Sequence, residues 1–156
     1  MRRIITILII VASLPLFGQS QYNGGSCSAG SIDLNAGFNI YFGGNVPIGF
    51  GVSADFGLMS MVSLGAEGGM GFTTGSAWGY VAFRPLFHFG AFFLPQNMDL
   101  QTGFLVGARI GSSADFLFDW EFGYKWWFSS NIGLNTEFAI GTSASHWTIG
   151  VSFKLH

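Results

Sequence analysis

The chain alternates between apolar and polar residues with a period of two, and it does so in eight successive segments. Between Ile32 and Phe42 every even position is apolar, whereas the odd positions include Asp33, Asn35 and Asn39. Alternation of this kind is typical of β-strands with two different faces. An amphipathic helix would repeat its apolar residues every three to four positions instead. The pattern therefore predicts an all-β chain.

Short sequences rich in glycine, serine and threonine separate the segments, among them GGNVP, TTGS and GSSA. Such turns connect neighbouring antiparallel strands as hairpins. Pro85 has no amide hydrogen, so we expect a bulge or an irregularity in the fourth strand. The predicted strands are 32–42, 48–58, 62–72, 77–89, 98–110, 116–128, 132–140 and 145–155.

The amino-terminal residues have the composition of an export signal. Arg2 and Arg3 are followed by an apolar stretch over 4–17 and by small residues at Gly18 and Ser20. This order predicts a cleaved signal peptide over residues 1–20. Residues 21–31 are rich in Gly, Ser, Asn and Gln and are expected to form a flexible periplasmic leader. The remaining 32–156 form a single predicted domain.

Charge and cysteine content exclude several classes of function. Without Arg2 and Arg3 the chain keeps four basic residues against eight acidic ones, a formal charge of −4, and it has no basic patch for nucleic acid. Cys27 is the single cysteine, so no internal disulfide can form. The three histidines, His88, His146 and His156, have no metal-ligand spacing. We expect neither a cofactor nor a metal.

The alternation is compatible with two kinds of barrel, a soluble one with an apolar lumen and a transmembrane one with an apolar outer wall. An eight-stranded barrel has an interior just wide enough for its side chains. The apolar faces carry Trp120, Trp126, Trp147 and much of the chain's 18 phenylalanines, which is too large a volume for the lumen. The sequence therefore predicts an eight-stranded antiparallel up-and-down transmembrane β-barrel.

The ionisable residues support this choice, because all eight acidic residues lie on the polar face of their segments. A charge that faces lipid at the bilayer midplane costs about 2–4 kcal/mol. We expect the inward charges to form a paired network that fills the lumen, the alternative being a narrow solute path. The predicted interior network consists of Asp55, Glu67, Arg84, Arg109, Glu121, Lys125 and Glu137.

Aromatic residues near strand ends are a second feature of transmembrane barrels, where they form girdles at the two membrane interfaces. Four residues are candidates by their position in the segments, namely Trp78, Tyr80, Trp126 and Trp147. We expect them to face the interfacial region of a bilayer.

The last segment, TIGVSFKL from Thr148 to Leu155, resembles the carboxy-terminal signal by which barrel proteins address the outer-membrane assembly machinery. Its matching positions are Thr148, Gly150, Phe153 and Leu155. The phrases VPIGFGVSADFG, RPLFHF and MDLQTGFLVGARIG make the chain from 32 onward similar to the small outer-membrane β-barrel domain family. The resemblance implies an eight-stranded barrel with periplasmic termini and the four odd-numbered turns outside.

These features favour an exported, non-enzymatic barrel of the bacterial outer membrane with a structural or surface-interaction role. Its expected partners are outer-membrane lipid and, during biogenesis, the assembly machinery, and it is expected to be a monomer. Two alternatives stay open. One is a narrow solute pore. The other is a lipid-modifying enzyme, for which a nucleophile, a base and an acid would have to meet. Its candidates lie close together near the last turn, namely Ser143, Ser145, His146 and Glu137.

Overall fold

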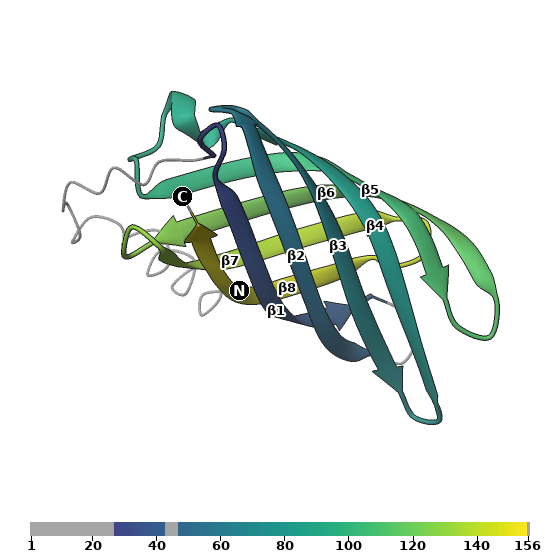
Figure 1. Ribbon diagram of the computed structural model, residues 1–156. Helices are drawn as coiled ribbons and strands as arrows, with labels where there is room; N and C mark the ends of the chain where they lie inside the picture. The colour runs from purple at the N-terminus through teal and green to yellow at the C-terminus, as the bar shows by residue number, and fades with distance from the viewer. Residues whose placement is uncertain (1–26, 43–46, 156) are drawn as a thin grey trace, which may run out of the picture.

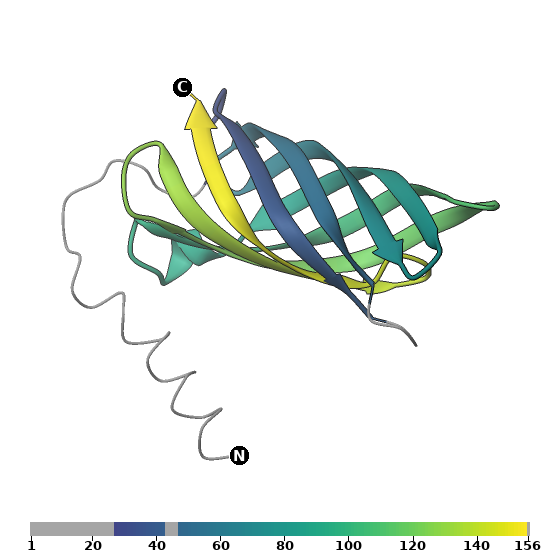
Figure 2. The same ribbon diagram turned by 90° about the horizontal axis from the view of Figure 1, so that it is seen from below.

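The computed structural model describes residues 27–42 and 47–155 of the 156-residue chain. Eight strands close into one barrel in which each strand pairs antiparallel with the next and β8 pairs with β1 (Figures 1 and 2). The predicted all-β up-and-down barrel is confirmed. The predicted signal peptide lies outside the described residues. The strands are β1 (Ile32–Tyr41), β2 (Ile48–Met59), β3 (Val62–Thr73), β4 (Ser76–His88), β5 (Met98–Ile110), β6 (Ala114–Trp127), β7 (Ile132–Gly141) and β8 (His146–Leu155).

The two faces of the sheet differ as the alternation predicts. On the outer face large apolar side chains are exposed, for example Phe50 at 62%, Phe116 at 68% and Ile140 at 65%. On the inner face charged side chains are buried, with Arg84 and Lys125 at 0% exposure. No helix in the described part of the chain is long and apolar enough to cross a bilayer.

The ladder between β4 and β5 is interrupted at the proline. Phe83 pairs with Val106 and Leu86 pairs with Gly103, but no pair is formed by Arg84 or Pro85 between them. The register on either side of the gap is the same. The expected irregularity at Pro85 is therefore an interruption of the ladder and not a bulge, because a residue without an amide hydrogen cannot donate to the neighbouring strand.

The two ends of the barrel are built differently. The β3–β4, β5–β6 and β7–β8 turns lie at one end, called here the odd-turn end, where β1 also ends and β2 begins. Among the described turns, the β3–β4 and β5–β6 hairpins extend furthest (Figure 1). At the opposite, even-turn end β1 begins and β8 ends. The β4–β5 connection at this end contains the short 3-10 helix η2 (Gly90–Phe92).

Residues 27–31, expected at the end of a flexible leader, contact the even-turn end. The amide of Gly30 donates to the carbonyl of Gly57 at 2.8 Å, and the amide of Gly57 donates to the carbonyl of Ser31 at 2.9 Å. The thiol of Cys27 is buried and lies 3.7 Å from the carbonyl oxygen of Val62. This segment therefore packs against the start of β3, whereas residues 21–26 lie outside the described residues.

Two of the four expected girdle residues point into the lumen. Trp78 and Tyr80 are 8% and 2% exposed, so the girdle prediction is wrong for them. The physical reason is space, because their rings lie over the backbone of Gly71 and Gly69 on β3. A Cβ at these glycines would come within 2.5 Å of Trp78 Cε2 and 2.4 Å of Tyr80 Cε1.

We therefore expect that the Tyr80 ring can pack inside the lumen only if residue 69 has no side chain. Gly69→Val should displace Tyr80 and lower the free energy of unfolding by about 1–3 kcal/mol, the usual range for overpacking. The measurement is the denaturant midpoint of the refolded protein in detergent. Gly68→Ala is the matched control, because a Cβ there would meet its nearest atom, Tyr80 O, at 3.4 Å. Equal midpoints for the two variants would contradict this account.

Candidate functional site

The centre of the lumen is occupied by Arg84 of β4, whose side chain is fully buried. Its guanidinium contacts four carboxylates. Nε lies 3.3 Å from Asp55, and Nη1 lies 2.9 Å from Glu67. Nη2 lies 2.5 Å from Glu121 and 3.1 Å from Glu137. A buried charge is tolerated when it is paired and hydrogen-bonded, and the forked guanidinium can bind several carboxylates at once.

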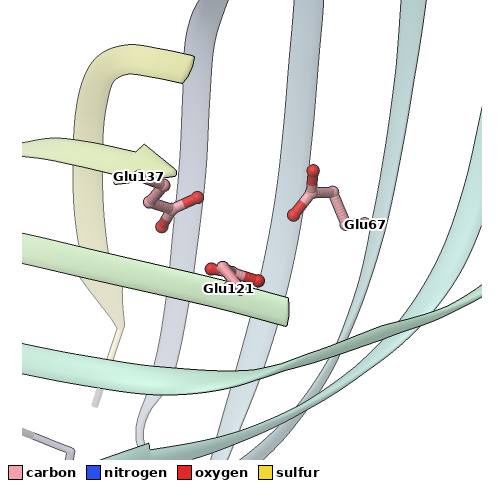
Figure 3. Close-up of side chains that lie close together, drawn as sticks. All are labelled: Glu67, Glu121 and Glu137. Carbon is pink, nitrogen blue, oxygen red and sulfur yellow. The ribbon is translucent and has the colours of Figure 1, made fainter. Parts of the chain in front are cut away.

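Three of these carboxylates form a group whose shape resembles a cation site. Glu67, Glu121 and Glu137 converge from β3, β6 and β7 (Figure 3), and one carboxylate oxygen of each lies within 4.8 Å of the others. Divalent cations such as Ca²⁺ prefer oxygen ligands of this kind. However, Arg84 contacts all three, so the positive charge that they require comes from the chain itself. The residues therefore do not fit a resident metal.

Lys125 of β6 is a second buried cation and extends the cluster toward the even-turn end. Its Nζ lies 3.4 Å from Asp33 Oδ2 and 3.6 Å from Asp55 Oδ2. Asp55 therefore bridges Lys125 and Arg84, and it also accepts a hydrogen bond of 2.9 Å from Asn35 Nδ2. One connected set of charges thus spans the middle of the barrel.

Neutral and weakly basic side chains complete this set. The hydroxyl of Tyr80 donates to Glu67, and Nε2 of His146 lies 3.5 Å from the same carboxylate. Gln101 donates to Glu137 at 3.1 Å. A cavity beside Glu67 and Glu137 has a volume of about 10 Å³, which is no more than the space of one water molecule. Packed side chains therefore fill this part of the lumen.

Six of the seven residues expected in the interior network meet in this cluster, and Arg109 lies apart from it. Arg109 is half-buried at the odd-turn end, where its guanidinium lies 4.1 Å from the ring centroid of Trp78 and donates to the carbonyl of Ser143 at 2.9 Å. The distance along β5 explains the separation, because alternation fixes the face of a residue but not its height in the barrel.

A similar cation–ring contact lies at the even-turn end. Nζ of Lys154 is 4.5 Å from the ring centroid of the buried Trp127.

The Cys27 thiol lies at the same end of the barrel. Burial raises its pKa from 9.0 to about 11, and the negative charges of Asp33 and Asp99 act in the same direction. The thiol is therefore protonated at neutral pH and is a poor nucleophile.

The serine and histidine residues near the last turn do not form a catalytic group. His146 lies with Nδ1 at 2.6 Å from the carbonyl of Ala144, and its other ring nitrogen faces Glu67. The hydroxyl of Ser145 bonds to the backbone of Gly141. Neither Ser143 nor Ser145 is hydrogen-bonded to the imidazole among the described contacts, so these four residues are not brought together as a triad.

Sequence reasoning missed a different group near the even-turn end. The hydroxyl oxygen of Ser63 lies 2.8 Å from Nε2 of His88, and Nδ1 of His88 lies 2.5 Å from Asp99 Oδ2. All three side chains are 1% exposed. Their shared inward parity on successive strands was a usable signal. That the three residues lie at the same level along the barrel axis follows only from the register of the strands.

The predicted assembly-signal residues lie on both faces of β8. Phe153 and Leu155 are on the outer wall, 43% and 50% exposed, whereas Thr148 is buried and donates to Asn39 Oδ1 at 2.8 Å. Gly150 lies opposite Gly37 of β1, at the seam where the barrel closes.

Comparison with known proteins places this geometry among solved barrels. No family model and no curated protein sequence matches the chain. Among solved structures, the amino-terminal β-barrel domain of Pseudomonas aeruginosa OprF is similar with a TM-score of 0.59 and 16% identity, over 81% of this chain and 98% of that one. The chain has the fold of the small outer-membrane β-barrels.

Two other outer-membrane proteins match this barrel over nearly their whole length. Ail, the attachment invasion locus protein of Yersinia pestis, has a TM-score of 0.58 and 10% identity, over 81% of this chain and 99% of Ail. The outer membrane protein OprG from Pseudomonas aeruginosa has a TM-score of 0.60 and 8% identity, over 84% and 98%. At these identities the likeness of the barrels concerns the fold alone.

Removing the central guanidinium is expected to destabilise the barrel strongly. Arg84→Met leaves four buried carboxylates without their shared cation, and breaking a buried ion pair in this way costs about 3–5 kcal/mol. The free energy of unfolding in detergent measures the effect. Adding Glu121→Gln should recover part of the loss, since one negative charge is removed, and a double-mutant cycle isolates this coupling. Strictly additive effects would contradict the contact between Arg84 and Glu121.

Proposed function

We propose that this chain is an integral protein of the bacterial outer membrane with a structural role in the envelope. The observation that carries the proposal is the outer wall, on which phenylalanine, isoleucine and leucine side chains are exposed around the barrel. Soluble monomers rarely expose apolar patches of more than a few hundred Å². A bilayer removes this cost, and a closed barrel leaves no unpaired strand edge in it.

The charge cluster supports a closed lumen and disfavours the pore. Arg84 of β4 contacts carboxylates on β6 and β7, so these ion pairs connect separate parts of the wall through the lumen. A conducting path would have to break these contacts. Barrels of eight strands have little interior space beyond their own side chains, in agreement with this arrangement.

The described odd turns favour a structural role over recognition of a large partner. The β3–β4 turn consists of Thr74 and Gly75, the latter at φ = 96°, a conformation that favours glycine. The β5–β6 and β7–β8 turns are also short, over 111–113 and 142–145. We propose that these turns face the outside and that the even-turn end faces the periplasm, with the barrel acting as a monomer surrounded by lipid.

The localisation and the closed lumen are tested together on the native protein. A closed barrel resists unfolding in cold detergent, so the protein extracted from isolated outer membranes should migrate differently before and after boiling. In planar bilayers the refolded protein should give no discrete conductance steps. A single unchanged band in an outer-membrane extract would count against the barrel. Regular conductance steps would show that the lumen conducts and would contradict the proposal that it is closed.

We also propose that the end of β8 is read by the assembly machinery. Phe153 lies on the outer wall, where a partner protein can contact it before the barrel closes. Phe153→Ala should lower the fraction of heat-modifiable protein in cells several-fold but leave refolding into detergent nearly unchanged. Val151→Ala is the control, because Val151 is exposed on the same face of β8 but is not one of the four matching positions of the signature. If both variants assemble equally well in cells, Phe153 is not part of an assembly signal.

A further inference from the structure

The hydrogen bonds of Ser63, His88 and Asp99 follow the order found in serine hydrolases. The serine hydroxyl faces one ring nitrogen of the histidine, at 2.8 Å, and the carboxylate faces the other, at 2.5 Å. With the proton on Nδ1 donated to Asp99, Nε2 is free to accept the hydroxyl proton of Ser63. This is the tautomer that a general base requires.

The strand register fixes this geometry. Ser63 is the second residue of β3, His88 is the last of β4, and Asp99 is the second of β5. Ser63 pairs with Leu86 and His88 pairs with Gln101, so each hydrogen bond joins side chains on the same face that are diagonal across two neighbouring strands. The three groups are therefore held by the barrel wall and not by loops.

Other buried serines of the lumen have different partners. Ser152 donates to Asn35 Oδ1 at 2.6 Å, and Ser53 accepts a hydrogen bond from Asn35 Nδ2. Among the described residues, Ser63 is the one serine whose hydroxyl contacts an imidazole.

We propose that Ser63 is the nucleophile of an acyl-ester hydrolase site at the even-turn end, with His88 as general base and Asp99 as the group that orients it. Ser63 Oγ forms a bond to the acyl carbon while its proton passes to His88 Nε2. The ester C–O bond then breaks, and His88 returns the proton to the leaving alcohol. Water, deprotonated by His88, attacks the acyl-serine, releases the carboxylic acid and restores the hydroxyl of Ser63.

The segment 27–31 is the cover of this site. Cys27 Sγ lies 3.7 Å from the carbonyl of Val62, directly before Ser63 in the chain. The cover is joined to β2 by hydrogen bonds between the backbones of Gly30, Ser31 and Gly57. Because Ser63 itself is buried, this segment must move before an ester can reach it. Apolar side chains at the same end, Met98 and Trp127 among them, suit an acyl chain.

The narrow lumen restricts the substrate to a carboxylic ester with a slender acyl chain. Such an ester can be a phospholipid of the surrounding leaflet or a small soluble molecule. The activity would add to the structural role proposed above, and its failure would leave that role intact.

The decisive experiment uses an alkyl fluorophosphonate, a reagent for activated serines, on the full chain folded in detergent. Peptide mass spectrometry should find the label on Ser63. His88→Gln and Asp99→Asn should each slow labelling by about 100-fold or more. Ser152→Ala should label at the rate of the unchanged protein. Folding of every variant is checked by its migration before boiling, and the result on the unchanged protein does not depend on any variant.

No label on the folded protein, or label on a residue other than Ser63, would overturn the proposal. So would equal labelling rates in the histidine and aspartate variants, because a purely structural hydrogen-bond chain does not activate Ser63. Cys27→Gly should increase the labelling rate several-fold, and an unchanged rate would reject 27–31 as the cover.

The source of the ester is distinguished by two substrates. p-Nitrophenyl butyrate represents soluble esters, and vesicles of phosphatidylethanolamine represent the leaflet. Release of nitrophenol alone assigns a soluble ester, and release of fatty acid from the vesicles assigns a lipid. Hydrolysis of neither substrate by a protein that folds would count against the activity.

Discussion

The contact between Arg84 and its four carboxylates is the interaction on which the interior of the barrel depends. One guanidinium from β4 joins Asp55 on β2, Glu67 on β3, Glu121 on β6 and Glu137 on β7. It therefore braces opposite parts of the wall through the lumen. Without it the inward faces would hold several like charges in a space from which water is largely excluded, and the same alternation that makes the outer wall apolar would make the interior unstable.

The lumen is layered along its axis around this cluster. A cation lies on an aromatic ring near each end, Arg109 on Trp78 and Lys154 on Trp127. Both cations belong to side chains with long apolar stems, which can fill space while the charge stays at the ring. The charged cluster in the middle and the aromatic rings near the ends together fill the space that the glycine-rich strands leave inside the barrel. Because the ionisable groups of the cluster contact opposite charges and the cations near the ends contact rings, the narrow interior can hold them.

The sequence predicted the strands and the direction of their faces, because alternation depends only on local backbone geometry. It therefore located Arg84, Glu121 and Lys125 inside. It did not predict their partners, since the height of a residue in the lumen depends on strand tilt and register, which no single segment contains. For the same reason the sequence does not predict the contact between Ser63 and His88, although both residues lie on the polar face. For Trp78 the residue type favours the membrane interface, but the parity of its strand places it inside the lumen.

The interruption of the β4–β5 ladder at Pro85 has a mechanical consequence. It lies beside Arg84, so the wall has fewer main-chain hydrogen bonds at the height where the lumen is most tightly braced by charge. The interruption concerns the β5 side alone, because Arg84 and Pro85 stay paired with Gly65 and Leu64 of β3, and the flanking β4–β5 pairs keep their alignment. At the height of Arg84 the main chain of β4 is therefore held by one neighbouring strand, and the link to the far side of the wall is made by the guanidinium instead of by the backbone.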